Sequence, residues 1–237
     1  METPHELSET VSHHKTPNPA FESTPSETSL TPHPQPSPNS PTLTIDFSWR
    51  NLQARITSNE TPQTPLYIID APITLKSPHL TFHHANPNGS NDSSTFGTAN
   101  LHAISIHADC TLHGHHLKLH PLKKLKTAYT HLSSAYSHTP GELVPMTWTT
   151  TCTLKLWEFI CLDANGNAVA KFAARIWATS RLGAIEFLGE GGARRECREE
   201  VVVVVCTLYY LMVVRSGNPL SLVGAMFART GTIGQGG

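Results

Sequence analysis

The chain has 237 residues and a net charge of −1 at pH 7, because its 17 basic side chains are balanced by 18 acidic ones. This balance leaves no overall positive field for nucleic acid, so no nucleic-acid partner is expected. Residues 1–41 are rich in Pro, Ser, Thr, Glu and His, with too few apolar side chains to offset the entropy of ordering. We therefore predict a disordered tail over 1–41, a folded domain over 42–230 and a flexible C-terminal tail over 231–237.

The first residues and the cysteines bear on the cellular compartment. The N-terminus opens acidic and has no apolar stretch of the kind that a secretory signal needs. The five cysteines are odd in number, and no two of them have C-x-x-C spacing. We expect reduced thiols in an intracellular, cytoplasmic protein, with the nucleus or the periphery of a membrane as the other locations.

Short strands dominate the middle of the chain. Apolar and polar side chains alternate over residues 43–49, LTIDFSW, which predicts a half-buried β-strand. Further strands are predicted at residues 65–71, 79–85, 100–108, 116–120, 146–163, 168–179 and 184–190. Residues 123–137 fit either a short helix or a strand followed by a loop, and Asn165-Gly166 is a strong hairpin signal. Strands at this spacing, separated by turn residues, are typical of an antiparallel barrel or sandwich.

An apolar run near the C-terminus allows two interpretations. Residues 201–214 contain no charged side chain, but as a helix these 14 residues reach only about 21 Å, against about 30 Å of bilayer core. Gly191-Gly192 precede the run and Arg215 follows it, which predicts a helix over 193–215 that is apolar on nearly every side after its first two turns. Such a helix must be enclosed by protein or by lipid. We expect a buried helix and no stable membrane span, with a membrane anchor through 201–214 as the alternative.

Three features together resemble a known family. They are the Pro/Ser-rich start, the series of antiparallel strands with the hairpin WEFICLDANG at 157–166, and the single apolar C-terminal helix. The chain resembles the tubby C-terminal-like fold, with uncharacterised fungal members closest and LURP-one-related proteins and phospholipid scramblases more distant. The resemblance covers roughly 43–229 and implies a mainly β fold, a closed antiparallel β-barrel of about twelve strands around a central hydrophobic C-terminal α-helix. Two segments depart from the family pattern: the loop at 86–97 interrupts the strand pairs, and 121–145 is longer than the pattern needs.

Histidines crowd the block 102–131 and raise the possibility of a metal site. Imidazole and thiolate are good ligands for zinc or copper, and Cys110 lies within the block. The alternation over 116–120 places Lys118 between two histidines on one face of a strand, and this cation disfavours a metal there. Exposed strand histidines are therefore the leading interpretation, with a metal-binding protein as the alternative. The weak ligand candidates are His113, His115 and His116.

Other catalytic or cofactor motifs are absent from the sequence. A calcium loop starting at Asp163 would need a Glu at its twelfth position, where the chain has Ala174, so the hairpin interpretation is favoured. There is no G-x-S-x-G elbow, P-loop or dinucleotide fingerprint. We therefore expect a protein that is not an enzyme and that needs no cofactor.

A basic cluster offers the remaining functional signal. Four lysines fall within residues 118–127, KLHPLKKLKT, namely Lys118, Lys123, Lys124 and Lys126. Near an anionic membrane surface each contributes about 1 kcal/mol. Tubby proteins bind phosphoinositides through Lys and Arg of the barrel wall, so the resemblance implies such a contact, without a residue-by-residue match of the ligand positions to this sequence. The prediction is a non-enzymatic binding or scaffold protein whose partner is anionic phospholipid or another protein, and a solvated basic loop is the alternative.

Overall fold

The computed structural model describes residues 41–72, 77–86, 94–102, 107–122, 128–153, 156–175 and 180–217. The predicted tail 1–41, apart from Pro41, and the predicted tail 231–237 lie outside these residues. Within the described part, the chain forms twelve strands, a short 3₁₀ turn η1 (Glu190–Ala193) and one helix, α1 (Arg195–Gly217). The strands are β1 (Thr42–Ser48), β2 (Gln53–Ser58), β3 (Pro65–Asp70), β4 (Leu80–His84), β5 (Thr95–Leu101), β6 (Ala108–Leu112), β7 (His115–Pro121), β8 (Ala128–Ser133), β9 (Val144–Cys152), β10 (Leu156–Leu162), β11 (Ala168–Arg175) and β12 (Arg181–Phe187).

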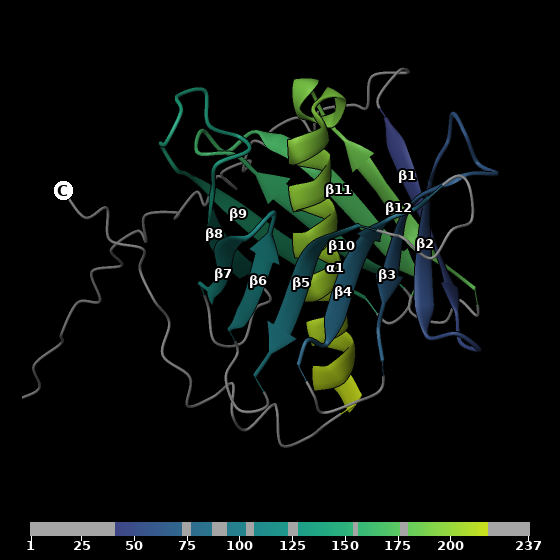
Figure 1. Cartoon of the computed structure of the whole chain (residues 1–237). Helices are drawn as coiled ribbons and strands as arrows, with labels where there is room; N and C mark the ends of the chain where they lie inside the picture. Colours follow the sequence, from purple (N-terminus) through teal and green to yellow (C-terminus); the bar gives the residue numbers. More distant parts are fainter. Residues whose placement is uncertain are drawn as a thin grey trace, which may run out of the picture. The chain divides into compact units, whose positions relative to one another are not determined.

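The strands close into a single antiparallel barrel (Figure 1). Each strand pairs with its neighbours in sequence, and β1 pairs with β12, where Leu43 lies opposite Ile185. Every strand of the described part has a paired neighbour on both sides, so the sheet has no unpaired terminal strand and the usual risk of edge-to-edge association is reduced. The predicted fold class, a closed twelve-stranded β-barrel with a C-terminal helix, is confirmed.

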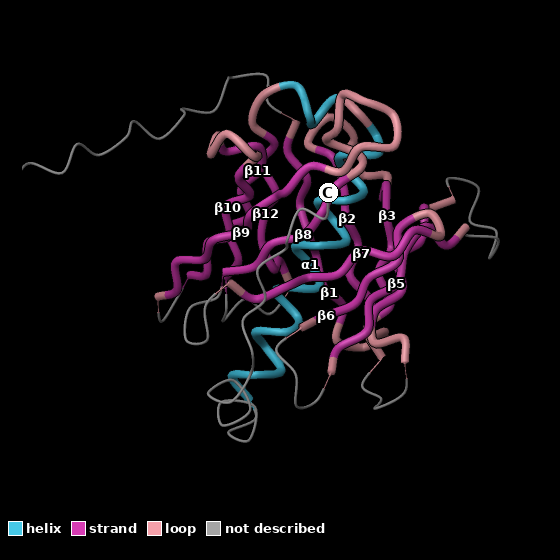
Figure 2. Tube along the Cα trace, turned by 90° about the vertical axis from the view of Figure 1, so that its left-hand side faces the viewer, coloured by secondary structure: helices cyan, strands magenta, loops and turns pink. Residues whose placement is uncertain are grey.

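The helix runs through the barrel, as two perpendicular views show (Figures 1 and 2). Val201–Val205 are each at most 2% exposed. Because successive residues of a helix turn by about 100°, five buried neighbours mean that the helix is enclosed on every side. Leu208, one turn further on, is also fully buried. In the described part of the chain, no helix is both long enough and apolar enough to cross a membrane.

The hairpin between β10 and β11 has the predicted turn at 163–167. Oδ1 of Asp163 accepts hydrogen bonds from the backbone N–H groups of Asn165 and Asn167, at 2.9 and 2.8 Å. Gly166 adopts φ +82°, a conformation that glycine reaches without strain. The Asp163 carboxylate therefore stabilises the turn of this hairpin.

Several predicted strand boundaries were wrong. The single run at 146–163 is two strands, because the chain reverses after Cys152 at a turn in which Thr153 Oγ1 accepts a 3.0 Å hydrogen bond from the Leu156 N–H. The run at 100–108 also divides, since β5 ends at Leu101 and β6 begins at Ala108. The strand at 53–58 was not predicted. Of the ambiguous segment 123–137, the described residues form β8 and a following loop, which confirms the strand interpretation for them.

Candidate functional site

The barrel wall opens between β7 and β8. Among the described residues these strands pair only through His120 with Thr130 and Pro121 with Tyr129. By contrast, β6 and β7 pair without interruption, from Ala108 opposite Leu119 to Leu112 opposite His115. A cavity of about 780 Å³ occupies the opening, which we call the β7–β8 cleft. Its size falls within the range of roughly 300–1,000 Å³ that ligand sites usually have.

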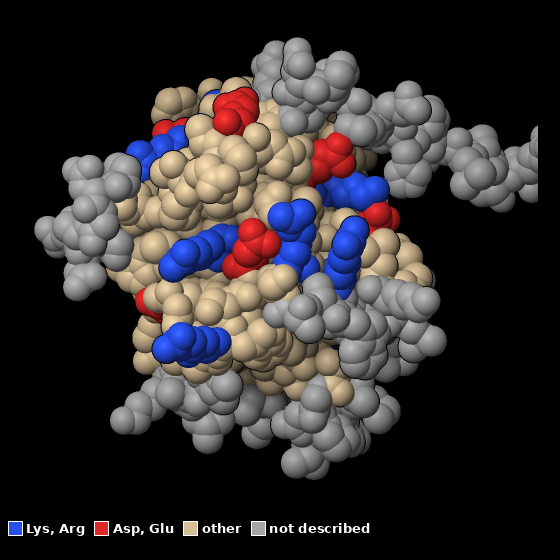
Figure 3. Space-filling view, turned by 90° about the vertical axis from the view of Figure 1, so that its right-hand side faces the viewer, with Lys and Arg blue, Asp and Glu red and all other residues tan. Residues whose placement is uncertain are grey.

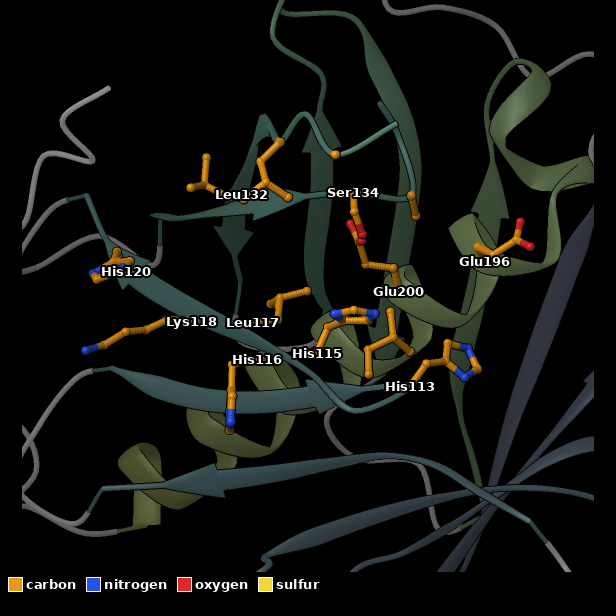
Figure 4. A pocket seen from close by; sticks show the side chains of 14 residues that line it. His113, His115, His116, Leu117, Lys118, His120, Leu132, Ser134, Glu196 and Glu200 are labelled. Atoms are coloured by element: carbon orange, nitrogen blue, oxygen red, sulfur yellow. The ribbon is translucent and has the colours of Figure 1, made fainter. Parts of the chain in front are cut away.

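Basic and imidazole side chains from β7 form one wall of the cleft (Figure 4). Leu117 and Leu119 point inward and are buried, which places Lys118 on the outer face, where it is exposed. This alternation is the predicted one. The residues of this wall are His115, His116, Lys118 and His120 of β7, together with His113 of the preceding turn. Of the four lysines predicted as a lipid contact, the structure describes only Lys118; Lys123, Lys124 and Lys126 lie outside the described residues.

His120 of this wall and the neighbouring His107 are held in the neutral form. Burial lowers the pKa of His120, and the nearby His107 and Lys118 lower it further. Burial and Lys118 also lower the pKa of His107, whose ring lies 5.4 Å from that of His120. Both imidazoles are therefore uncharged at pH 7 and gain charge only in more acidic solution. At neutral pH the positive charge next to these two rings comes from Lys118.

Acidic side chains from α1 lie on the other side of the cleft. Glu196 and Glu200 both line it, and Glu200 points across the cleft toward Ser134 with His115 beside it (Figure 4). Glu200 is almost completely buried, and its Oε1 lies 3.0 Å from Nε2 of His131 on β8. The structure shows no hydrogen bond from a described residue to its second oxygen, Oε2. The cleft thus has a carboxylate at one end and an amine at the other.

A second buried carboxylate lies one residue earlier on the helix. Glu199 Oε1 accepts a 2.6 Å hydrogen bond from Arg195 Nε and lies 2.9 Å from His84 Nε2, while Oε2 lies 2.6 Å from His113 Nε2. Burial raises the pKa of Glu199, but the hydrogen bonds from Arg195, His84 and His113 outweigh it, so the net pKa is lowered. The ionised carboxylate thereby ties the first turns of α1 to β4 and to the β6–β7 turn.

These two glutamates were missed as site residues. The sequence signal is their position: Glu199 and Glu200 directly precede five valines of a helix that must be enclosed, so the carboxylates enter the barrel with it. Buried carboxylates need partners, and unpaired basic or imidazole groups on the strands are the natural ones. The partners themselves come from strands far away in sequence, 115 residues away for His84 and 69 for His131.

The histidine block does not converge on a metal centre in the part of the chain that the structure describes. No group of three or more His, Cys, Asp or Glu side chains there has the geometry to hold a metal ion. His113 and His131 are engaged with the buried glutamates, and His102 lies 2.6 Å from Asp109. Of the weak candidates, His115 and His116 are neighbours on one strand, where successive side chains point to opposite faces.

Elsewhere on the surface, charges of opposite sign are intermixed. Figure 3 shows one face on which Lys and Arg side chains lie next to Asp and Glu. Among the surface ion pairs, Lys171 Nζ lies 2.7 Å from Glu158 Oε1, and Arg181 Nε lies 3.4 Å from Asp46 Oδ1. Exposed pairs of this kind contribute little to stability.

The thiols are free, and most are buried. Burial raises the pKa of Cys110 and of Cys206 to about 12 and that of Cys197 to about 11. Cys161 is buried with its pKa also raised, whereas Cys152 is exposed. A thiol with such a pKa stays protonated at neutral pH and is a poor nucleophile.

Comparisons with known protein families, with curated proteins and with solved structures found no match to this chain.

Proposed function

We propose that this protein is a non-enzymatic binding or scaffold protein on a tubby-like barrel, and that it contacts anionic phospholipid through the basic wall of the β7–β8 cleft. The observation that carries the proposal is the opening of the barrel beside Lys118. A cavity large enough for a headgroup lies there, next to a segment that continues into three more lysines. The closed twelve-stranded barrel with its C-terminal helix is consistent with the tubby-like assignment.

Apolar side chains beside the same cleft support contact with a membrane surface. Leu143 is 52% exposed and Leu132 is 37% exposed, and both line the cleft. Basic residues next to exposed leucines are the combination that binds peripheral proteins to anionic bilayers, because the charges attract the headgroups and the apolar groups enter the interface. This arrangement favours an intracellular protein at the cytoplasmic surface of a membrane.

The protonated thiols and the paired glutamates favour binding over catalysis. Cys110 and Cys161 are buried, Cys206 is partly buried, and desolvation raises the pKa of all three thiols, so none is an activated nucleophile. Glu199 has hydrogen bonds with three groups that keep it ionised. A general acid must carry a proton, so this carboxylate suits a structural role better.

Vesicle sedimentation tests the proposal. The full-length protein is mixed with phosphatidylcholine vesicles that contain or lack phosphatidylglycerol, in about 0.1 M and about 1 M salt, where the Debye length falls from ~10 to ~3 Å. We expect binding only to the anionic vesicles and its loss at high salt. A variant with Lys118, Lys123, Lys124 and Lys126 changed to Gln should bind at least fivefold more weakly.

The control variant is Lys171→Gln, which removes one lysine from an ion pair on β11. It should bind as the unmodified protein does. Equal binding of the fourfold variant and the unmodified protein, with both correctly folded by circular dichroism, would exclude this surface as the lipid contact. The lowered pKa of His120 adds a second signature: binding should strengthen in solutions more acidic than the ordinary imidazole pKa of 6.5, because this imidazole then gains charge.

A further inference from the structure

The helix is not packed equally against all sides of the barrel. It approaches β5 and β6 most closely. Gly97 of β5 permits this approach, since a Cβ there would lie 3.0 Å from Cγ2 of Val203 and 2.9 Å from the carbonyl oxygen of Thr111. On that side no space is left between α1 and the wall, so any unfilled volume must lie elsewhere.

The unfilled volume lies beside the C-terminal half of α1. A second cavity, of about 260 Å³, is bounded by the helix and by the inner faces of β1 to β4, β11 and β12, and we call it the helix–β1 pocket. Ile45, Leu80 and Phe172 form its deep part and are almost completely buried. Ala54 and Ala71 line it with short side chains, at positions where larger residues would fill the space.

The described residues of the lining are mostly apolar, and none of them carries a formal charge. Aliphatic and aromatic side chains supply the walls, and the polar side-chain groups among the described lining residues are the hydroxyls of Tyr209 and Tyr210, the thiol of Cys206 and the indole N–H of Trp49. Burial raises the pKa of Tyr209, Tyr210 and Cys206, so these groups stay protonated at neutral pH. No Asp, Glu, Lys or Arg is among the described residues that line the pocket. Such a site penalises a charged ligand, which would lose its hydration without gaining a partner.

The mouth of the pocket is also apolar. Trp49 is 65% exposed there, and Val213 and Val214 are 40% and 42% exposed. A pocket with apolar walls and an apolar rim suits a hydrophobic small molecule, and its volume of about 260 Å³ suits a smaller one than the usual sites of roughly 300–1,000 Å³ hold. At roughly 30 Å³ per water-sized group, 260 Å³ holds a chain of about nine such groups.

We propose that the helix–β1 pocket binds the uncharged aliphatic chain of a small amphiphile, with the polar end of that molecule at Tyr209 and Tyr210. The proposal is independent of the lipid headgroup contact at the β7–β8 cleft, because the two cavities share no lining residue. An unbranched chain suits a space between a helix and the strands of a barrel better than a broad ring system does.

Titration of the full-length protein with decanol and with decanoate at pH 7.5 tests the proposal. Calorimetry measures the affinity. Tryptophan emission should shift to shorter wavelength when the ligand covers Trp49. We expect decanol to bind at least tenfold more tightly than decanoate. Ala54→Phe should fill the pocket and weaken decanol binding at least tenfold, while the volume-conserving Leu182→Met should leave it within twofold.

Failure of decanol to bind would overturn the proposal, and two further measurements would then show what the pocket is instead. If decanol does not bind and Ala54→Phe raises the melting temperature, the pocket is only a packing void of the barrel. If decanol does not bind and the protein is a dimer that Trp49→Ser converts to a monomer, the apolar mouth is an interface between two copies. Equal affinity for decanol and decanoate would contradict the stated selectivity for an uncharged chain.

Discussion

Gly97 and Val203 are in direct contact across the interface of β5 and α1, and a Cβ at position 97 would lie 3.0 Å from Cγ2 of Val203. It would also lie 2.9 Å from the backbone oxygen of Thr111, which cannot rotate away. Gly97→Ala should therefore push the helix or the strand out of place. We expect a loss of about 1–3 kcal/mol in the free energy of unfolding, the usual range for overpacking a core. Urea denaturation followed by circular dichroism measures this change.

A double-mutant cycle separates the two contacts that the added Cβ at position 97 would make. In a Val203→Ala background the added Cβ loses its clash with the valine but keeps its clash with Thr111. The cost of Gly97→Ala should therefore be smaller in that background, but not zero. If the two changes are strictly additive, the helix does not pack against Gly97 in the way described.

The stability of the fold should fall in acid because of Glu199. Its folded-state pKa is lowered below the ordinary value of 4.5. A carboxyl with a lowered pKa contributes stability that is fully present above its unfolded pKa and is lost as the pH falls through the folded one. We expect the free energy of unfolding to be level near pH 6–7 and to decrease below about pH 4.5, as measured by urea denaturation at a series of pH values.

Glu199→Gln removes this charge while nearly preserving the shape of the side chain. It should lower the stability at pH 7 by about 2–3 kcal/mol, the scale of hydrogen bonds to a charged group. It should also flatten the acid limb of the stability profile. Glu196→Gln is the matched control, since Glu196 is exposed on the same turn, and it should change neither quantity measurably. An unaltered acid limb in Glu199→Gln would assign the acid sensitivity to other groups.

The barrel could be predicted because the alternation of apolar and polar residues can be recognised within each strand by itself. In β1, Leu43 and Ile45 are buried while Thr44 and Asp46 face outward, as the alternation in LTIDFSW indicates. The enclosed helix could be predicted for a related reason, since a run that is apolar on every side needs surroundings that cover it. The strand Gln53–Ser58 was not predicted because only Ala54 and Ile56 are apolar on its inner face, and alanine has a low propensity for β-strands.

The sites could not be predicted to the same extent, because they depend on contacts between distant segments. Nothing near Glu200 in the sequence indicates that His131 will lie 3.0 Å away. The β7–β8 cleft arises because two strands that are adjacent in sequence pair over only two residue pairs among the described residues, which local patterns do not encode. The exposed Lys118 was predictable from alternation alone, and its position beside a cavity was not.

Thiol reactivity should single out Cys152. Cys152 is exposed at the end of β9, and partial burial raises its pKa above the ordinary value. Cys110, Cys161 and Cys197 are buried, and Cys206 is partly buried with a pKa raised to about 12, which leaves almost no thiolate there. In the native protein at about pH 8, Ellman's reagent should modify a single thiol, because only an accessible thiolate attacks. In concentrated urea all five cysteines should react. Cys152→Ser should abolish the native reaction; rapid modification of further thiols in the native state would show that the barrel opens more readily than its packing indicates.

Because the helix is enclosed, we expect two of its positions, six residues apart, to differ in their tolerance of a charged side chain. Leu208 is fully buried and Val214 is 42% exposed. Leu208→Asp would place an unpaired carboxylate among apolar side chains, which costs several kcal/mol even if the group takes up a proton. Since a domain of this kind has only about 5–15 kcal/mol of stability, we expect this variant to be largely unfolded or insoluble.

Val214→Asp is the matched control, because the new carboxylate stays in contact with water at the end of the helix. We expect it to fold, with less than about 1 kcal/mol of lost stability, the usual scale of surface substitutions. Soluble yield and the cooperativity of thermal unfolding distinguish the two variants. A helix held loosely outside the barrel would tolerate both substitutions alike, because water would then reach Leu208 as well. A soluble, cooperatively folding Leu208→Asp protein would therefore contradict the enclosure of α1.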